Sequence, residues 1–579
     1  MGNRPRKWIP AAISITLILL ICLVAGLGYI RERYSPSKER ADLYGLYQVT
    51  SESEAAVVVN NLLTKEKAKL RDGEAYLSWT YVTESLNKRI YMDQQERILL
   101  YALPDRVVRI PEGTKLSEWT DRTGAENKDA LVWYEEDAVI YLSVTCIDFF
   151  TDVDFELYRS PGRLYIDTPQ GVCQQAAVSE DTPLRVLGGI KSEIVADMES
   201  GSRVTILDAM EEWSQVRTAD GWTGYIQNKY LGPAEALEKT SDFEEPVYTS
   251  LTRDHEICLV WHQIFDAGGN DNLEELLEKA QGVNVISPTW FSLSDNEGNF
   301  TSLASESYVE TAHARGLEVW GLIDNFSSDV STFEVLSRTS SRTALIQNLT
   351  AAAIQYHLDG INIDFESIKS DTGPHFVEFI RELSVSCRTN GLVLSVDNNV
   401  PTAGTSFYDR AEQGVMADYV IIMAYDEHWR TSDAGSTSSL PFVRAGIENT
   451  LAEVPQNKVI NGLPFYTRMW RFDPTAEIPE GSDPLKAEYV LESTAVGMDR
   501  AKRNLEEGGA EIVWNEELSQ YYGEYEADGS LYRIWLEDAR SMESKLNATA
   551  SFDVGGVAFW KLGLESDEVW EKIAAYMNR

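Results

Sequence analysis

The sequence contains few of the residues from which metal centres and nucleic-acid interfaces are built. Among 579 residues there are 5 cysteines and 6 histidines. Cys146, Cys173, Cys258 and Cys387 show neither a C-x-x-C motif nor a Cys/His metal spacing, and they leave a Cys146–Cys173 disulfide and isolated buried thiols as alternatives. Basic residues number 51 against 92 acidic ones, and the formal net charge of −41 repels nucleic acids and anionic membrane surfaces. We therefore expect no metal site and no nucleic-acid partner.

One uncharged run is long enough to cross a membrane. Residues 8–30 carry no charged side chain and follow Arg4, Arg6 and Lys7. A cleaved signal peptide has a shorter apolar core and a cleavage site of small residues, which this segment offers only poorly. We predict a cytoplasmic tail at 1–7, a transmembrane signal anchor at 8–30 and an exported remainder on the extracellular, cell-wall side. A cleaved signal peptide is the alternative.

The segment that follows the anchor divides into a linker and a small domain. Residues 31–52 are polar and charged, and they are predicted to form a juxtamembrane linker. From 53 to 172, short strand-like runs follow a helical pattern near Glu54–Leu70, which predicts a small α+β domain. This pattern resembles the non-catalytic amine-oxidase N-terminal-like domain of some bacterial wall enzymes, and it indicates no copper site.

Residues 180–233 form a run of short strand patterns joined by tight turns. The pattern W-x-x-V…G-W-x-G-Y-I resembles the bacterial SH3 domain, a small β-barrel often attached to wall-directed enzymes. Its members are Trp213, Val216, Gly221, Trp222, Gly224, Tyr225 and Ile226. Trp222 and Tyr225 either bind wall peptide or only fill a small core, because a fold by itself does not establish a site. Residues 234–253 are acidic, contain proline and are predicted to be a linker.

From residue 254 onward the sequence alternates between apolar strands and helical patterns. The candidate strands are 256–263, 283–291, 317–325, 360–366, 392–399, 418–426, 459–466 and 556–563. Eight apolar strands separated by helices predict a (β/α)8, or TIM, barrel over residues 254–579. The long gap before the last strand holds strands of its own, which predicts a small α+β insertion at about 470–535, after strand seven.

Polar residues gather where these strands end. They are Asp324-Asn325, Glu366, Asp397-Asn398-Asn399, Tyr425-Asp426 and Tyr466. Any one of them could simply cap the helix that follows. Because the carboxyl ends of barrel strands and the loops after them build the active site, the whole set predicts a single pocket.

The stretch LDGINIDFESI, residues 358–368, places polar side chains inside an apolar strand. Alternate residues share a face, so Asn362, Asp364 and Glu366 are predicted to point into the barrel. Asp359 has the opposite parity and lies at the strand start. The charge of Asp364 should raise the pKa of Glu366 and keep it protonated near neutrality. A protonated carboxyl group at a cleft mouth can protonate the leaving oxygen of a glycoside.

At this stretch the sequence resembles a known family. D-G-x-N-x-D-F-E, residues 359–366, is similar to the D-x-x-D-x-D-x-E signature of family 18 glycoside hydrolases, the chitinase-like enzymes. MAYDEHW, 423–429, is similar to the M-x-Y-D segment of that family. GGVAFWKLG, 555–563, places Trp560 at the position of its floor tryptophan. RIWLEDARS, 533–541, is similar to the branch of spore-germination and cell-wall glycosidases.

The resemblance implies a role for each matched residue. Glu366 is expected to act as general acid and then as general base, with no second carboxylate as nucleophile. Asp364 is expected to accept a hydrogen bond from the acetamido N–H of the sugar. The acetamido oxygen attacks the anomeric carbon and receives a hydrogen bond from Tyr425. The expected substrate-binding residues are Asp359, Asn362, Met423, Asp426 and Trp560. The substrate then needs an N-acetyl group, and no metal or cofactor is implied.

Asn362 departs from the family pattern, because ordinary chitinases carry an aspartate there. The change removes a charge beside Asp364 and favours the wall-enzyme branch. Together with the anchor and the SH3-type module, it predicts a membrane-anchored glycosidase that acts on peptidoglycan or a related N-acetylated wall glycan. The alternatives are a catalytically weak barrel that binds wall glycan as a lectin or scaffold, and a chitinase.

Overall fold

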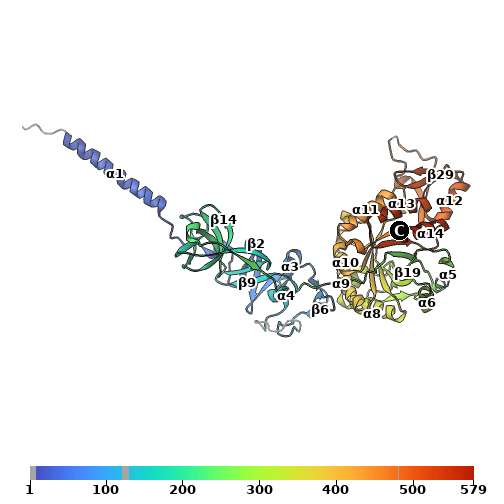
Figure 1. The fold of residues 1–579 in the computed structure, drawn as a ribbon, viewed down its shortest axis with the longest axis horizontal. Helices are drawn as coiled ribbons and strands as arrows, with labels where there is room; N and C mark the ends of the chain where they lie inside the picture. The colour runs from blue at the N-terminus through green and yellow to red at the C-terminus, as the bar shows by residue number, and fades with distance from the viewer. Residues whose placement is uncertain (1–7, 120–128, 480) are drawn as a thin grey trace, which may run out of the picture. The chain divides into compact units, whose positions relative to one another are not determined.

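The computed structural model describes residues 8–119, 129–479 and 481–579 (Figure 1). The predicted cytoplasmic tail, 1–7, lies outside the described residues. The chain divides into two compact units. One contains residues 1–90 and 110–245, and the other contains residues 91–109 and 246–579. The barrel unit therefore includes a short segment from the N-terminal half of the sequence.

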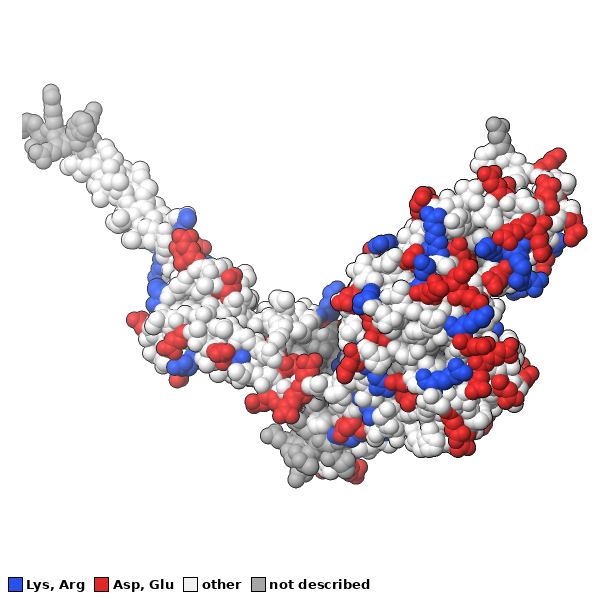
Figure 2. Space-filling model, turned by 45° about the vertical axis from the view of Figure 1, so that its right-hand side comes forward, with Lys and Arg blue, Asp and Glu red and all other residues white. Residues whose placement is uncertain are grey.

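The N-terminal helix α1, Trp8–Tyr34, is long and apolar enough to cross a membrane. The most apolar 18-residue window of Ile9–Tyr34 has a mean hydropathy of 2.6, and none of that window is buried. Figure 2 shows it as an uncharged rod with charged residues only at its end. The helix continues past the predicted end at residue 30 because Arg31 and Arg33 lie in its last turn, where positive side chains favour the helix dipole.

The next domain is built on a seven-stranded sheet of order β7-β8-β3-β2-β1-β10-β9. The helical pattern predicted near Glu54–Leu70 is wrong: these residues form the hairpin β1–β2, with Val59 paired to Leu62. Asn60 and Asn61 make the turn with φ of 46° and 69°, which asparagine tolerates better than other residues. The elements are β1 Glu54–Val59, β2 Leu62–Arg71, β3 Glu74–Ser78, α3 Trp79–Ser85, β7 Trp133–Glu136, β8 Val139–Ser143, α4 Val144–Phe150, β9 Asp154–Tyr158 and β10 Gly162–Asp167.

The SH3-type region forms a second seven-stranded sheet, of order β13-β12-β16-β15-β14-β11-β17. Its strands are β11 Gly171–Ala177, β12 Thr182–Arg185, β13 Ile194–Met198, β14 Arg203–Ala209, β15 Trp213–Thr218, β16 Thr223–Gln227 and β17 Glu235–Lys239. β17 lies within the predicted linker 234–253 and pairs with β11 at the sheet edge. Its side chains are mostly exposed, so the strand lacks the buried face that would mark it in the sequence.

The predicted linker 31–52 is also packed rather than free. The Ser37 amide donates to the Ile190 carbonyl, and the Ala41 amide donates to the Ile194 carbonyl. Helix α2, Leu43–Tyr47, buries Tyr47 in a cluster with residues of β1 and β10. These contacts join the segment to both small domains of the N-terminal unit.

Trp222 of the SH3-type sheet is covered by the neighbouring domain. The Arg163 guanidinium lies 3.5 Å from the centre of the Trp222 ring and donates to the Gly221 carbonyl at 2.7 Å. Gly221 is so close to the Tyr158 ring that an added Cβ would lie 2.4 Å from it. This burial favours the packing role of Trp222 over peptide binding.

The C-terminal region is a closed barrel of eight parallel strands, as predicted. Its strands are β18 Ile257–His262, β19 Val285–Leu293, β21 Glu318–Asp324, β22 Gly360–Asp364, β23 Val393–Asn399, β24 Tyr419–Met423, β25 Val459–Pro464 and β31 Gly556–Trp560. β18 pairs with both β19 and β31, which closes the ring, and the short strand β20, Phe300–Ser302, adds an antiparallel edge to β19.

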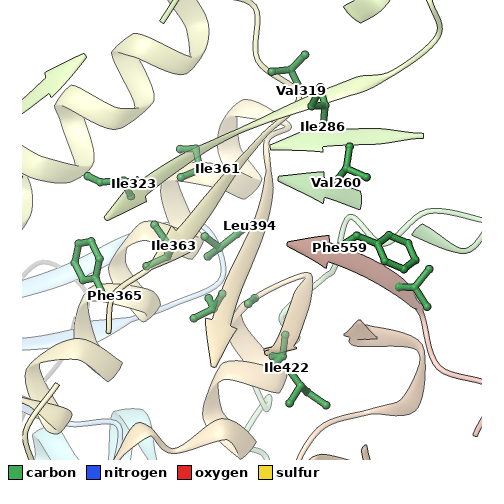
Figure 3. Close-up of a cluster of buried hydrophobic side chains, with 14 of the residues drawn as sticks. Val260, Ile286, Val319, Ile323, Ile361, Ile363, Phe365, Leu394, Ile422 and Phe559 are labelled. Atoms are coloured by element: carbon green, nitrogen blue, oxygen red, sulfur yellow. The ribbon is translucent and has the colours of Figure 1, made fainter. Parts of the chain in front are cut away.

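Apolar side chains on the outer face of the barrel pack beneath the helices. Figure 3 shows Ile361, Ile363 and Phe365 of this cluster, and Ile361 and Ile363 are fully buried. The surrounding helices are α5 Leu273–Leu276, α6 Glu306–Ala314, α7 Thr332–Ser337, α8 Thr339–Gln355, α9 Gly373–Asn390, α10 Arg410–Met416, α11 Leu440–Leu451, α13 Ala539–Ala550 and α14 Asp567–Met577. The polar residues that alternate with this set consequently face the interior.

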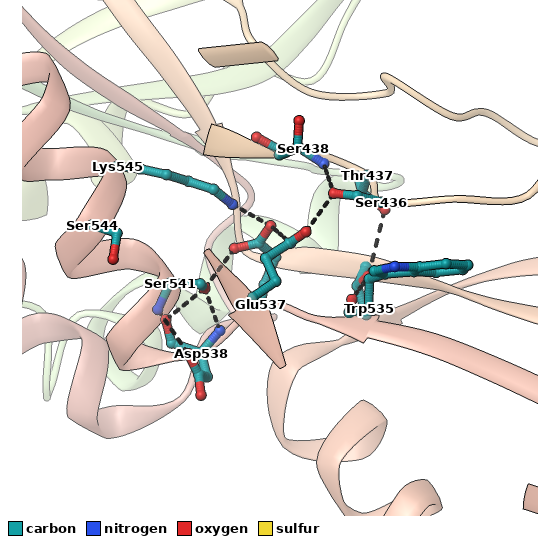
Figure 4. Close-up of polar contacts among 12 residues, drawn as sticks. Ser436, Thr437, Ser438, Trp535, Glu537, Asp538, Ser541, Ser544 and Lys545 are labelled. Carbon is teal, nitrogen blue, oxygen red and sulfur yellow. Dashed lines mark hydrogen bonds and ion pairs between the residues drawn. The ribbon is translucent and has the colours of Figure 1, made fainter. Parts of the chain in front are cut away.

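The predicted insertion after the seventh strand is present as an α+β layer. It consists of β26 Tyr466–Phe472, β27 Val490–Gly497, α12 Met498–Glu507, β28 Val513–Asn515, β29 Gln520–Ala527 and β30 Ser530–Leu536. A fully buried ion pair between Glu537 and Lys545 joins the end of β30 to α13 (Figure 4). Gln520 and Ser541 donate to the same carboxylate. Because both charges are buried, removing either partner would be strongly destabilising.

A three-stranded sheet from the N-terminal half belongs to the barrel unit. It consists of β4 Tyr91–Asp93, β5 Ile98–Ala102 and β6 Val107–Pro111, and residues 91–109 cluster with the barrel. Asp93 accepts hydrogen bonds from the Thr339 amide and hydroxyl at 2.6 Å, and Glu96 accepts from the Ser340 amide at 2.8 Å. These carboxylates cap α8 from a distant part of the sequence. The predicted domain 53–172 therefore does not hold this segment.

Candidate active site

The strand β22 places its polar side chains inside the barrel, as its parity predicts. Asn362 is fully buried and Asp364 is 4% exposed. β22 ends at Asp364, and Glu366 follows in the loop, half-buried. Asp364 is paired with Asp324, the last residue of β21. Carboxyl groups from two neighbouring strands thus meet at the carboxyl end of the barrel.

Asn362 makes hydrogen bonds through all of its polar positions. Its Oδ1 accepts from Trp261 Nε1 at 2.9 Å and from Ser287 Oγ at 3.1 Å. Its Nδ2 donates to Ser395 Oγ at 3.0 Å and to Asp397 Oδ1 at 2.8 Å. The predicted substrate-binding role of Asn362 does not fit this position, because a fully buried amide with every hydrogen bond satisfied has no group left for a ligand.

Asp364 carries a buried oxygen that has no hydrogen-bond partner among the residues that the structure describes. Its Oδ1 makes no hydrogen bond. Burial raises the pKa of Asp364 well above its ordinary value, and the neighbouring charges of Asp397, Glu366 and Asp324 raise it further. A buried acceptor without a donor is costly, and such groups are concentrated at functional sites.

The side-chain amide of Asn325 makes hydrogen bonds to both the N–H and the carbonyl of Glu366. Asn325 Oδ1 accepts from the Glu366 N–H at 2.9 Å, and Asn325 Nδ2 donates to the Glu366 carbonyl at 3.0 Å. Asn325 Nδ2 also donates to Thr332 Oγ1 at 2.9 Å, which anchors this clamp to α7. The loop after β22 therefore presents the Glu366 side chain in a fixed position.

The pKa of Glu366 is raised, which favours its protonated form. Burial is the largest cause, followed by the charges of Asp426 and Asp324. The sequence predicted the direction of this shift but ascribed it to Asp364. A half-buried carboxylic acid at the mouth of a barrel can donate a proton to a leaving group.

Tyr425 and Asp426 reach the same site from the end of β24. The Asp426 carboxylate accepts from the Tyr466 hydroxyl at 2.7 Å and from Arg468 Nη2 at 3.0 Å. The Tyr425 ring lies 6.2 Å from the Tyr466 ring, at 74°. Burial raises the pKa of Tyr425 well above its usual value, so its hydroxyl stays neutral and can donate. Tyr466 and Arg468 come from β26, so the insertion supplies part of the site.

Trp560 and Met423 end two of the barrel strands. Trp560 is partly buried at the end of β31, and its ring lies 5.8 Å from that of Trp261 inside the barrel. Met423 ends β24 and is 7% exposed. Trp261 Nε1 donates to Asn362 Oδ1, so Trp261 contacts both the buried Asn362 and the ring of Trp560.

Asp359 is not at this site. Its Oδ2 contacts His313 Nε2 and accepts from the Val319 amide, each at 2.8 Å. Because it precedes β22 and contacts the beginning of β21, it lies at the opposite, amino-terminal end of the barrel. Its predicted substrate-binding role is therefore wrong, and the reason is its position at the strand start.

Three further features of the site were not assigned a role from the sequence. Asn325 and Asp397 belong to the predicted polar strand ends, but their contacts with Glu366 and Asn362 depend on strands distant in the sequence. Arg468 lies in the insertion. Exposed aromatic rings follow three strands in the loops at the same end of the barrel: Phe265, Phe326 and Trp429. Among the described residues, no group of three or more His, Cys, Asp or Glu side chains could hold a metal ion.

A closed parallel barrel with helices around it defines the (β/α)8 class of fold, and its carboxyl groups lie at the end of the barrel where the active sites of this class are found. Residues 294–565 match the sequence profile of "Glycosyl hydrolases family 18", and residues 181–232 match that of "Bacterial SH3 domain". The chain thus contains a glycosyl hydrolase family 18 domain in its barrel region, and it carries a bacterial SH3 domain.

Several known proteins are similar to the barrel region. The cortical fragment-lytic enzyme of Bacillus anthracis is 25% identical over 352 residues, which cover 60% of this chain and 72% of that protein. The uncharacterized glycosylase YvbX of Bacillus subtilis is 22% identical, over 53% of this chain and 89% of that protein. The crystal structure of the C-terminal domain of a candidate chitinase from Desulfitobacterium hafniense superposes with a TM-score of 0.50 at 20% identity. It covers 56% of this chain and 99% of that domain, and it supports the barrel fold.

Proposed function

We propose that the protein is a membrane-anchored glycosidase that hydrolyses N-acetylated wall glycan of the peptidoglycan type with retention of configuration. The observation that carries this proposal is the pair formed by Asp364 and Glu366: a buried unpartnered oxygen beside a half-buried carboxyl group whose pKa is raised. Asp364 can accept a hydrogen bond from an N–H of the substrate, and Glu366 can supply a proton to the leaving oxygen.

The proposed reaction uses the substrate's own acetamido group as nucleophile. Glu366 donates its proton to the glycosidic oxygen as the bond to the anomeric carbon breaks. The acetamido oxygen bonds to that carbon, while Asp364 accepts from the acetamido N–H and Tyr425 donates to the oxygen. Glu366, now a carboxylate, removes a proton from water. The water oxygen bonds to the anomeric carbon, and the bond between that carbon and the acetamido oxygen breaks. Two displacements at one carbon retain its configuration.

Three observations favour wall glycan as the substrate. Cortical fragment-lytic enzymes are among the relatives of the barrel. The SH3 domain and the apolar helix α1 precede it in the chain. Trp560 at the end of β31 offers an apolar face on which a sugar ring can stack, as do Phe265 and Trp429, which are exposed in loops at the same end of the barrel.

The test compares glycan cleavage by the protein lacking α1 with cleavage by its Glu366→Gln variant. Purified peptidoglycan and N-acetylglucosamine oligosaccharides are digested, and the fragments are analysed by mass spectrometry. We expect the wild type to cleave peptidoglycan and Glu366→Gln to lose at least about 100-fold in rate. Glu310→Gln, an exposed carboxyl group on α6, is the matched control and should retain full activity.

Two outcomes would contradict the proposal. Cleavage that is unchanged in Glu366→Gln would remove this residue from the site. Binding of glycan by the wild type without any cleavage would instead support the alternative of a lectin or scaffold, which the asparagine at position 362 favours. Proton NMR of the first product anomer separates retention from inversion, and inversion would exclude the substrate-assisted route.

A further inference from the structure

Two buried carboxyl groups lie side by side on β22 and β23. The two strands are parallel, with Asn362 paired to Ser395 and Ile363 to Val396. Asp364 and Asp397 are the next residues along each strand, and they are 4% and 3% exposed. Ser395 contacts Asn362 inside the barrel, so Asp397, two residues later, points to the same interior as Asp364.

The orientation of the Asn362 amide distinguishes these two carboxyl groups. Its oxygen accepts from Trp261 and Ser287, which fixes the amide nitrogen towards Ser395 and Asp397. A hydrogen bond from an amide stabilises a carboxylate. Asp397 receives this bond, whereas Asp364 Oδ1 receives none. An ionised aspartate at position 362 could not donate to Asp397.

Among the described residues, none of the groups named as interacting with the pair is positively charged. Those that interact electrostatically with one or both carboxyl groups are Asp324 at the end of β21, Glu366 in the loop after β22, Tyr408 before α10 and Tyr425 after β24. Burial raises the pKa of both aspartates well above the usual range. The charge of Asp397 raises the pKa of Asp364 further, whereas at Asp397 the hydrogen bond from Asn362 opposes the rise. Two adjacent carboxyl groups in so dry a place are not both ionised near neutrality.

We propose that Asp364 and Asp397 hold a single proton between them, and that Asn362 determines which of the two carries the charge. In the free enzyme Asp397 is ionised and Asp364 holds the proton. When the acetamido N–H of a substrate reaches Asp364, the proton passes from the Asp364 carboxyl to Asp397, and Asp364 becomes the acceptor. No other reactant is needed. The catalytic consequence rests on the proposed function, in which Asp397 is a positioning residue that acts through Asp364.

The first test follows the carboxyl groups directly, by 13C NMR titration of the protein lacking α1 and labelled at its aspartate carboxyl carbons. We expect Asp364 to titrate well above about pH 4, the ordinary range of an aspartate. In Asp397→Asn this step should move down by at least about one pH unit, because the neighbouring like charge has gone. Ser395→Ala, which removes an acceptor of Asn362 but no charge, should leave the step in place.

The second test measures kcat/KM for peptidoglycan across pH. We expect Asp397→Asn and Asn362→Asp each to lower kcat/KM by about 10- to 100-fold. In Asp397→Asn, the limb of the pH profile that follows the ionisation of Asp364 should also shift. The exchange variant Asn362→Asp/Asp397→Asn restores one amide and one carboxyl group, so it should recover to within about tenfold of the wild type. A purely structural role would lower Tm without moving the limb. Should Asp397→Asn not fold, Asp397→Ser provides the same comparison.

Two results would overturn the inference: independent titration of both aspartates near about pH 4, or an upper step that stays in place in Asp397→Asn. Either would do so even for an active enzyme. If instead the wild type cleaves no glycan while the upper step moves as expected, the shared proton stands and the proposed function fails. The NMR measurement thus separates the two.

Discussion

Asp364 has a side chain that the fold does not satisfy. A buried carboxyl oxygen without a donor destabilises the folded state, and a neutral amide of the same shape would relieve the charge repulsion with Asp397 and Glu366. Proteins retain such groups where a ligand completes their hydrogen bonds. The residue that we expect to contact the acetamido group is therefore also a site where stability and activity oppose each other.

The substitution Asp364→Asn should accordingly raise stability while it abolishes cleavage. The folded-state pKa of Asp364 lies above its unfolded value of about 3.9, so between these two values the folded chain holds more protons. This contribution makes the folded state less stable as pH rises through that interval, and the variant lacks it. We expect the Tm of Asp364→Asn to exceed that of the wild type by about 2 °C at pH 7.5, with a smaller difference at pH 4.5.

Calorimetry at both pH values checks this expectation. The control is Asp105→Asn, whose carboxyl group is 70% exposed and should change Tm little at either pH. A variant that is less stable than the wild type at both pH values would show that the Asp364 carboxylate is satisfied in the folded protein.

For single residues, the sequence predicted the direction in which the side chains point but not their hydrogen-bond partners. Strand parity placed Asn362 and Asp364 inside the barrel, where the structure has them. The role of Asp397 depends on the lateral pairing of β22 with β23, and the Asn325 clamp depends on a hydrogen bond to a backbone 41 residues away. Neither contact leaves a local pattern that a single sequence could reveal.

Among whole elements, the barrel strands were the most predictable. They are buried on both faces, so each appears in the sequence as a continuous apolar run with turn residues at its ends. The exposed strands were the least predictable. β2 has mostly polar side chains whose spacing resembled a helix, and only the Asn60-Asn61 turn marks the hairpin. β17 at an edge was taken for a linker for the same reason.

The segment 91–109 leads to a prediction about the stability of the barrel unit. Asp93 supplies the cap that α8 does not obtain from Arg338, its own residue at the N-cap position. We expect Asp93→Ala to lower the stability of the barrel unit by about 1–2 kcal/mol, the usual cost of losing an N-cap. Differential scanning calorimetry of the protein lacking α1 measures this as a lower Tm for the barrel transition.

Asp105→Ala is the matched control for this prediction, because Asp105 lies in the same segment, is 70% exposed and forms an ion pair with the exposed Arg106. It should change stability by no more than about 0.5 kcal/mol. Equal effects of the two substitutions would mean that the contacts of Asp93 with Thr339 add nothing to the barrel.

For the whole molecule, the packed segment after α1 determines where a stable fragment can begin. Ser37 and Ala41 contact the SH3 domain, and Tyr47 is buried. We expect the full chain to partition with membranes and a fragment 36–579 to be soluble. A fragment 53–579 should be soluble as well, but the N-terminal unit should melt at a lower temperature, because it loses Tyr47 and leaves the Arg185 guanidinium without the Ser37 carbonyl.

Fractionation of cells and thermal melts of the two fragments test this prediction. Equal melting temperatures for 36–579 and 53–579 would show that residues 36–52 contribute nothing to the fold. Recovery of the full chain in the soluble fraction with α1 intact would contradict its role as an anchor.

Because residues 91–109 belong to the barrel unit, a single proteolytic cut does not simply separate the two units. The chain passes from one unit to the other three times, at residues 90–91, 109–110 and 245–246. A protease that cuts near residue 245 breaks only one of these passages. The N-terminal fragment keeps residues 91–109, which hold the carboxylates that cap α8 of the barrel fragment. Shedding of the hydrolase therefore requires that this segment also be cut or pulled from the barrel.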